Sequence, residues 1–342
     1  MSAPSRPNHS AGEAMKVDSG STPAISSARH HRRFRAVSGP WSLRAWAAGR
    51  DPQRPISRRS PYLASTAEDA HSKSYIMTSQ QAALLNFLRT KGVEEQFQIE
   101  NSPFFPGAPH WHFVRSHSDP IPITCLSLTG RGRQPQKPTE VELHSDPGAL
   151  MPLTRDLANR DELLCFLNEE LVMDNQHWAD EAFGLFDLYP DTVMIGGRIR
   201  NRSGEVLEAG LQLGFGGLCG SPDRGRKEAD PGYFGQAWKQ RSVGAVSLQF
   251  AVLRATFLLD ALEHLPSGAS LPLLVAWLGA FALRVRKRVV YTPLLGGVIS
   301  SDWEHLINAE EKELFKSVNR DILPDRRYYP APLSLQQGYI LD

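Results

Sequence analysis

The stretch 163–210 constrains the fold of this chain more than any other part of the sequence. It opens with an apolar run, 163–167, that has the length of a buried strand. Apolar residues then recur at helical spacing over 176–188, and Tyr189-Pro190-Asp191 ends that pattern because proline cannot continue a helix. A second apolar run, 192–195, precedes Gly196-Gly197. Strand, helix and strand in this order predict a βαβ unit, and therefore an α/β fold with a mixed, mainly parallel sheet flanked by helices.

The first predicted strand of this unit ends in two carboxylates and an amide, Asn168-Glu169-Glu170. In open α/β sheets, ligands bind beyond the carboxyl ends of the strands. We interpret the three residues as a candidate ligand site. The alternative is that Glu169 and Glu170 are solvated turn residues.

The same stretch, read together with the segments after it, resembles the family 2 glycosyltransferases, which have the GT-A fold. In that family a strand runs into an acidic triplet, and a tryptophan-bearing helix and a strand ending in Gly-Gly follow. The resemblance covers 121–300 and continues through GEVLEAG (204–210), LGFGG (213–217), DPGYFG (230–235) and VVYTP (289–293). It implies a GT-A-like domain over 119–342 that transfers a sugar from a nucleotide-sugar donor to a saccharide acceptor in polysaccharide assembly.

The resemblance also implies roles for individual residues on the donor side. Glu170 takes the place of the family's metal-binding aspartate, with Asn168 and Glu169 beside it, so the resemblance implies a site for Mg²⁺ or Mn²⁺. Asp146 lies near the end of the predicted second strand, where the family has an aspartate that contacts the nucleotide, although in Ser-Asp-Pro-Gly it is equally a turn former. In the loop between the first two strands, Arg131 and Arg133 are candidates to hold the diphosphate; the alternative is that both lie in water.

On the acceptor side, the loops that the family places there contain Tyr233 and Arg241. The sequence departs from the family at the catalytic base, which the resemblance puts near 276–278. No carboxylate occurs between Glu263 and Asp302, and the nearest replacements are Asp260, Glu263 and His264. Because an inverting transferase needs a base for the acceptor hydroxyl, we expect transfer to be very slow or absent.

A second departure lies between the predicted strands 121–128 and 139–144. The link 129–138 contains two prolines and is too short for the usual crossover helix. Either the two strands are not parallel neighbours, or this half of the nucleotide-binding fold is shortened. Both departures favour an alternative function, in which a catalytically degenerate homologue binds a glycan or an active partner glycosyltransferase.

Residues 1–76 differ from the rest of the chain. They are rich in serine, proline, alanine and arginine without apolar periodicity, which predicts a disordered basic leader. Met77 then opens a small appendage, 77–118, with a predicted helix capped by Thr78 or Ser79 and two short strands, 97–100 and 111–115. His110 and His112 alternate with aromatic residues, as in a half-exposed strand.

We expect the leader to be dispensable, and the sequence leaves open whether translation starts at Met1 or at Met77. A chain that starts at Met77 should unfold at the same temperature as the full chain, because the leader has too little apolar surface to repay its ordering. Differential scanning calorimetry checks this. A melting temperature lower by many degrees would show that the leader packs on the domain.

Charge and cysteine content limit the function classes. The leader carries twelve lysines and arginines against five acidic residues, so the remainder has 26 against 32 and is mildly acidic, which argues against a nucleic-acid binder. Three widely spaced cysteines favour a reducing, cytoplasmic compartment. The apolar run 269–283 is shorter than the roughly 20 residues of a spanning helix and predicts a buried core helix. Basic residues over 284–288 leave peripheral contact with a membrane from the cytoplasmic side open.

Two further regions complete the prediction. The run 241–253 is rich in β-branched residues and predicts a pair of strands. Residues 303–318 predict a helix capped by Ser301 or Asp302, and the tail 325–335 is expected to pack back on the domain.

Overall fold

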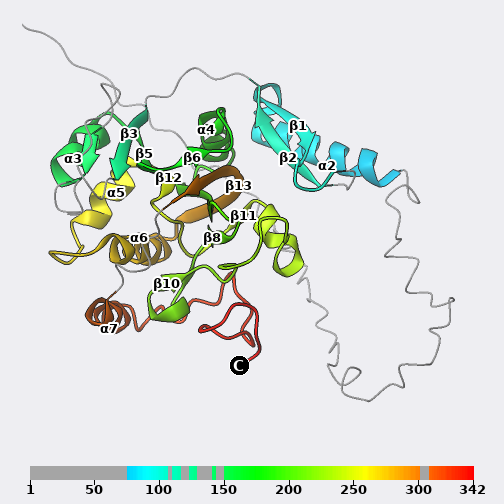
Figure 1. Ribbon diagram of the computed structural model, residues 1–342. Coiled ribbons are helices and arrows are strands. Elements are labelled where there is room, and N and C mark those ends of the chain that lie inside the picture. The colour runs from blue at the N-terminus through cyan, green and yellow to red at the C-terminus, as the bar shows by residue number, and fades with distance from the viewer. Residues whose placement is uncertain (1–74, 107–109, 117–122, 129–140, 144–149, 301–307) are drawn as a thin grey trace, which may run out of the picture. The chain divides into compact units, whose positions relative to one another are not determined.

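The computed structural model describes residues 75–106, 110–116, 123–128, 141–143, 150–300 and 308–342 (Figure 1). All of them belong to one compact unit. The leader 1–74 lies outside the described residues, and so do three predicted donor-side residues, Arg131, Arg133 and Asp146.

The core of the described structure is a nine-stranded mixed sheet. Its main path runs through β11 (Arg241–Ser242), β13 (Arg288–Ile299), β7 (Thr192–Asn201), β12 (Phe250–Arg254), β5 (Leu163–Asn168), β3 (Ile123–Leu128) and β4 (Val141–Leu143). Off this path, β6 (Val172–Met173) pairs with β13, and β8 (Val206–Ala209) pairs with β7. The predicted α/β fold with a mixed sheet is confirmed.

Strand direction explains how the central unit is built. Strands β4, β3, β5, β7 and β13 all run the same way, whereas β12 is antiparallel to both of its neighbours, β5 and β7. The predicted unit is therefore present as β5, α4 (Trp178–Leu188) and β7, with β12 between its two strands. Strands β3 and β4 are parallel neighbours, which excludes the first of the two alternatives for the link that joins them.

Each face of the sheet carries its own apolar cluster, because alternate residues of a strand point to opposite faces. Leu164 and Phe166 of β5 pack with α3 (Leu150–Asn159), α5 (Ala255–Leu262) and α6 (Leu271–Arg284). Leu163 and Cys165 of the same strand pack with α4 on the other face. Figure 1 shows these helices around the sheet. The short predicted strand at 192–195 is part of a longer one, since β7 continues to Asn201.

The Gly-Gly pair lies inside β7 rather than at its end, and both glycines are required by close approaches. A side chain at Gly196 would meet Val246, and a Cβ at Gly197 would lie 1.4 Å from the backbone oxygen of Leu295. Strand β13 bulges there, between Tyr291 and Gly296. A residue larger than glycine at 197 would therefore push the two central strands apart.

The predicted appendage is a helix packed on a hairpin. Helix α2 (Tyr75–Lys91) begins before Thr78 and Ser79, so the predicted cap at those residues is wrong: both lie inside the helix. The 3-10 turn η2 (Glu94–Gln96) leads into β1 (Phe97–Asn101), which pairs antiparallel with β2 (Trp111–Arg115). Leu88 and Phe97 pack against Leu188 at the end of α4, which fixes the appendage on the domain.

Two 3-10 turns and one long helix complete the domain. The 3-10 turn η4 (Phe215–Gly217) lies between β9 (Gln212–Leu213) and β10 (Cys219–Gly220), and η5 (Tyr233–Trp238) precedes β11. The predicted core helix at 269–283 is α6, whose central residues are buried except for the half-buried Trp277. Within the described residues, no helix is long and apolar enough to span a bilayer.

Two predicted details at the C-terminal side differ from the structure. The last helix, α7 (Ala309–Val318), begins later than predicted, and its cap is Asn308, whose side chain accepts a hydrogen bond from the Glu311 amide at 2.7 Å. Strands β11 and β12 do not pair with each other; β11 pairs with β13, and β12 lies between β5 and β7. Composition predicts strand content there but not the partner.

Candidate functional site

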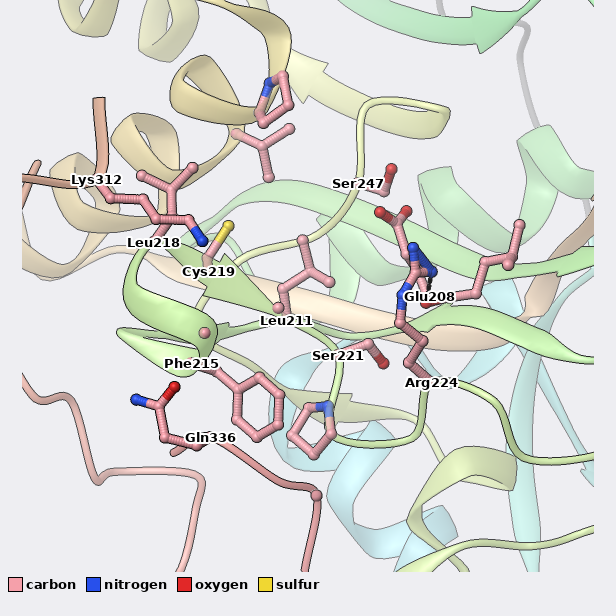
Figure 2. Close-up of a pocket in the computed structure, with 17 residues that line it drawn as sticks. Glu208, Leu211, Phe215, Leu218, Cys219, Ser221, Arg224, Ser247, Lys312 and Gln336 are labelled. Atoms are coloured by element: carbon pink, nitrogen blue, oxygen red, sulfur yellow. Dashed lines mark hydrogen bonds between the residues drawn. The ribbon is translucent and has the colours of Figure 1, made fainter. Parts of the chain in front are cut away.

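A cavity of about 390 Å³ lies beside β8 (Figure 2). Its walls come from segments far apart in the sequence: β8, the turn at β10, the start of α6, α7 and the C-terminal tail. The apolar part of the lining includes Leu207, Leu211, Phe215, Leu218, Pro272 and Val275. The polar part consists of Glu208, Ser221, Arg224, Ser247, Lys312 and Gln336. An apolar cavity with a few polar groups is the usual form of a small-molecule site.

Charged groups line the cavity from different elements. In the view of Figure 2, Glu208 and Ser247 lie on one side and Lys312 lies on the other. Arg224 donates from Nη1 to the backbone oxygen of Leu207 at 3.2 Å, which fixes its guanidinium at the wall. Burial, and then the charge of Glu208, raises the pKa of the Cys219 thiol far above its usual range, so Cys219 is a neutral wall residue. The charged chemistry of the site therefore rests on Glu208, Arg224 and Lys312.

A short chain of hydrogen bonds joins this cavity to the predicted metal site. Ser247 Oγ accepts a hydrogen bond from the backbone N–H of Gln249 at 3.1 Å. Two hydrogen bonds then join Asn168 to Gln249. The backbone N–H of Asn168 donates to the backbone oxygen of Gln249 at 2.8 Å, and Asn168 Nδ2 donates to Gln249 Oε1 at 3.1 Å. The end of β5 and the cavity are thus held in one rigid arrangement.

Within the predicted metal triplet, the structure separates the amide from the two carboxylates. Asn168 is buried, and its Oδ1 accepts from the Glu170 amide at 2.9 Å, so its side chain holds the turn together. Glu169 and Glu170 are exposed in that turn. The described residues contain no cluster of three or more histidine, cysteine or acidic side chains that could hold a metal by themselves. Two carboxylates suit a Mg²⁺ that keeps several waters and binds mainly to substrate phosphates.

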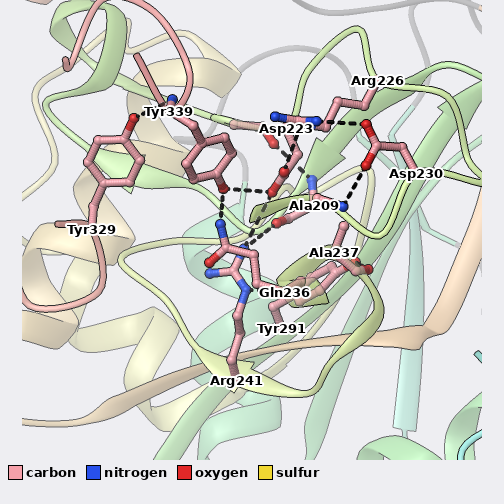
Figure 3. A network of polar contacts seen from close by, with 12 residues as sticks. Ala209, Asp223, Arg226, Asp230, Gln236, Ala237, Arg241, Tyr291, Tyr329 and Tyr339 are labelled. Carbon is pink, nitrogen blue, oxygen red and sulfur yellow. Dashed lines mark hydrogen bonds and ion pairs between the residues drawn. The ribbon is translucent and has the colours of Figure 1, made fainter. Parts of the chain in front are cut away.

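Arg241, one of the two predicted acceptor-side residues, lies beside a buried carboxylate, Asp223 (Figure 3). The other, Tyr233, is linked to that carboxylate only through Tyr339. Asp223 has no exposed surface and accepts from the Tyr339 hydroxyl at 2.9 Å. Tyr233 stacks on the Tyr339 ring with the centroids 5.0 Å apart. The C-terminal tail therefore packs back on the domain here, as predicted, and holds the loop that carries Tyr233.

Two arginines offset the buried charge of Asp223. Arg226 Nε lies 3.3 Å from Asp223 Oδ1, and Arg241 Nη2 lies 3.9 Å from Oδ2. Arg241 also donates to the backbone oxygens of Ala209, at 2.8 Å, and Gln236. Burial raises the pKa of Asp223 above its usual value. The hydrogen bond from Tyr339, and then the charges of the two arginines, oppose this rise without cancelling it. This network is a structural support for the loops beside the cavity, and neither Tyr233 nor Arg241 lines the cavity itself.

The position where the family has its base carries no acid in this chain. Ala276 and Leu278 are buried in the core, and Trp277 donates to the backbone oxygen of Ala261 at 3.2 Å. From α6 the cavity instead receives Pro272 and Val275. The predicted replacements Asp260, Glu263 and His264 are all exposed near the end of α5, and none of them lines the cavity.

Two carboxylates near the cavity escape prediction from the sequence. Glu311 of α7 lies at the start of α6, where it accepts from Ser270 N at 2.7 Å and from Ser270 Oγ at 2.5 Å. It is 9% exposed and serves as a cap for that helix. Glu208 lines the cavity from β8. The feature of the sequence that points to Glu208 is its place in GEVLEAG (204–210), where an acidic residue occurs in a short strand between glycine-rich turns.

A third acid, Glu181 of α4, is held between two strands. Its Oε1 accepts from Thr292 Oγ1 at 2.7 Å and from Gln240 Nε2 at 2.5 Å. Burial raises the pKa of Glu181 to about 7, although both hydrogen bonds oppose that rise. This carboxyl therefore titrates in the physiological range.

Glu181 predicts a loss of stability as pH rises. Its folded pKa lies above that of the unfolded chain, so the folded state holds the proton more tightly; the resulting stability is full below about pH 4.5 and is lost as pH rises through 7. We expect Glu181→Gln, which cannot ionise, to raise the free energy of unfolding by about 1–3 kcal/mol at pH 8. At pH 4.5 it should change little. Urea unfolding at both pH values measures this, and equal effects at the two would contradict it.

Comparisons with known proteins assign no family to the chain. No protein-family model matches it, and no curated protein matches it. Among the solved structures that match is the crystal structure of A197 from STIV, with 13% sequence identity and a TM-score of 0.30. The match covers 53% of this chain and 94% of that one. A likeness this weak assigns neither a family nor an activity.

Proposed function

We propose that this chain transfers a sugar from a nucleotide-sugar donor to a saccharide acceptor, and that the acceptor binds in the cavity beside Glu208. The observation that carries the proposal is the cavity itself. Hydrogen bonds of Ser247 and Gln249 join it to the carboxyl end of β5, and α/β proteins bind ligands beyond the carboxyl ends of their strands. It contains a carboxylate, and Ser247 and Gln249 connect it to the acidic turn at Glu169 and Glu170.

The chemistry assigned to the cavity is proton removal from the acceptor. The acceptor O–H bond breaks, and its proton passes to the Glu208 carboxylate. The acceptor oxygen then forms a bond to the anomeric carbon of the donor, and the nucleotide diphosphate leaves with the electron pair of the old bond. Arg224 and Lys312 supply N–H donors that orient the acceptor in the cavity. A Mg²⁺ or Mn²⁺ ion held by Glu169 and Glu170 would neutralise the leaving diphosphate.

A second candidate is binding of the saccharide without turnover. It is favoured by the residues of α6 that line the cavity, Pro272 and Val275, neither of which can act as a base. The family that this chain resembles has its base on the corresponding helix. Such a protein would present a glycan to an active partner glycosyltransferase. For either candidate we propose a cytoplasmic location, with the basic end of α6 against a membrane surface.

Turnover separates the two candidates. The full chain is incubated with UDP-, GDP- and dTDP-sugars, Mn²⁺ and a panel of oligosaccharides, and nucleotide release is followed with and without the acceptor. Release that depends on the acceptor supports transfer. Saccharide binding without such release supports the second candidate, and the absence of both contradicts the two proposals together.

Donor binding should depend on a divalent ion held at the turn after β5. We expect Glu170→Gln, which removes a charge and keeps the side-chain size, to weaken Mn²⁺-linked binding of the nucleotide sugar at least tenfold, because one of two carboxylates is lost. Isothermal titration with UDP, GDP and dTDP derivatives measures this. Glu263→Gln, which changes an exposed acid outside the cavity, is the matched control. Binding that survives both chelation and Glu170→Gln rules out the metal role.

A further inference from the structure

A second cavity, of about 180 Å³, lies where the appendage meets the domain. The hairpin contributes Ser102, Phe104, His110, Trp111, His112 and Phe113. The domain contributes Tyr189, Trp238, Gln240, Pro293 and Leu294. None of these residues lines the cavity beside Glu208. The two cavities are therefore separate sites.

The aromatic walls of this second cavity are held in place. Trp111 Nε1 donates to Gln80 Oε1 at 3.0 Å, and Trp238 Nε1 donates to the backbone oxygen of Glu228 at 3.2 Å. Because each indole N–H already donates to a partner outside the cavity lining, the two rings offer apolar surface to the cavity and no hydrogen-bond donor. Rigid aromatic walls bind a ligand with little loss of conformational entropy.

The polar groups of the cavity are uncharged. Burial lowers the pKa of both His110 and His112, so the two imidazoles are neutral at pH 7. No lysine, arginine, aspartate or glutamate belongs to the described lining. Lys239 lies outside this lining, but its charge reaches His110 and helps to lower the pKa of that imidazole. Because no charged side chain belongs to the described lining itself, the cavity suits a neutral ligand.

One polar atom in the lining lacks a partner. Nδ1 of His112 is buried and makes no hydrogen bond in the described structure. A buried polar atom without a partner costs about 1–3 kcal/mol, and a small shift of the ring that uncovers Nδ1 to a ligand hydroxyl would remove that cost. Gln240, fixed by its bond to Glu181, adds a second polar group.

We propose that this cavity binds a single neutral sugar ring. A pyranose has apolar C–H groups for the aromatic walls and hydroxyl groups for His112 and Gln240, and it carries no charge. The cavity, at about 180 Å³, has room for one sugar ring. This site is independent of the proposed transfer, and it would hold one residue of a glycan on the appendage side of the protein.

Intrinsic fluorescence tests the proposal, because Trp111 and Trp238 line the site. The full chain is titrated with the methyl glycosides of D-glucose, D-galactose, D-mannose and L-rhamnose, and separately with inorganic phosphate. We expect at least one glycoside to give a saturable change with a Kd on the order of 1 mM, and phosphate to give none. His112→Phe should weaken that binding at least tenfold. Trp111→Phe, which shrinks the wall, should weaken it as well.

Three controls make the result decisive. His264→Phe changes an exposed histidine elsewhere and should leave the titration unchanged, and so should Glu205→Gln, which changes an acid that lines neither cavity. Melting curves establish that each variant is folded. If His112→Phe does not fold, Trp111→Phe serves as the cavity variant instead. No saturable response to any glycoside overturns the proposal. It is equally overturned by a response to phosphate, or by a glycoside response that both cavity variants leave intact.

Discussion

Glu208→Gln is expected to reduce acceptor-dependent sugar transfer by about 10²–10⁴-fold, which is the usual contribution of a positioned general base. The amide keeps the size of the side chain but cannot take a proton from the acceptor hydroxyl. Donor binding should be unchanged, because the donor-side turn at Glu169 and Glu170 is not altered. Initial rates of nucleotide release, with and without acceptor, measure the effect.

Glu205→Gln is the control for this change. Glu205 precedes the same strand, but its carboxylate pairs with Lys227 at 2.9 Å and does not line the cavity. We expect its transfer rate to stay within a factor of about two of the unchanged chain, as for a surface substitution of 0.5 kcal/mol or less. If Glu208→Gln and Glu205→Gln give the same rate, Glu208 is not the base.

Asp223→Ala should cause the largest loss of stability among the predicted changes. The carboxylate is fully buried, and its removal leaves the Tyr339 hydroxyl and the Arg226 and Arg241 guanidinium groups without their shared partner. Breaking a buried ion pair costs about 3–5 kcal/mol. At 2–4 °C per kcal/mol for a domain of this size, the melting temperature should fall by roughly 6–20 °C.

An exposed aspartate provides the comparison. Asp156 pairs with Arg160 at 2.8 Å, but its side chain is 69% exposed. Asp156→Ala should change the free energy of unfolding by about 0.5 kcal/mol or less. Calorimetry on both variants tests the difference. Equal melting temperatures for the two would show that the network of Figure 3 does not hold the tail on the domain.

Local sequence patterns predicted the order of the central elements well. The strand at Leu163, the helix before Pro190 and the strand at Thr192 are all present, because apolar periodicity and a proline stop are local signals. The pattern could not place β12 between β5 and β7, since strand pairing depends on residues distant in sequence. The cap of α7 was also misplaced, because several capping residues precede the helix and local propensity does not choose among them.

The candidate site was predictable only in part. The sequence located the acidic turn and the loops with Tyr233 and Arg241, because each follows an element that it predicts. It did not assign Asn168 to the interior or bring Tyr339 to Asp223, since both depend on tertiary contacts. It missed the cavity, whose walls combine Glu208 of β8, Val275 of α6 and Lys312 of α7.

Filling the cavity beside Glu208 tests its assignment as the saccharide site most directly. Val275→Phe adds a ring from α6, and overpacking of this kind costs about 1–3 kcal/mol, which a melting curve detects. Isothermal titration of the full chain and of this variant is carried out with the oligosaccharide panel in the presence of Mn²⁺ and UDP, GDP or dTDP. We predict that saccharide binding is lost in folded Val275→Phe, whereas nucleotide binding is retained. Saccharide binding that is unchanged in the folded variant would contradict the assignment of this cavity.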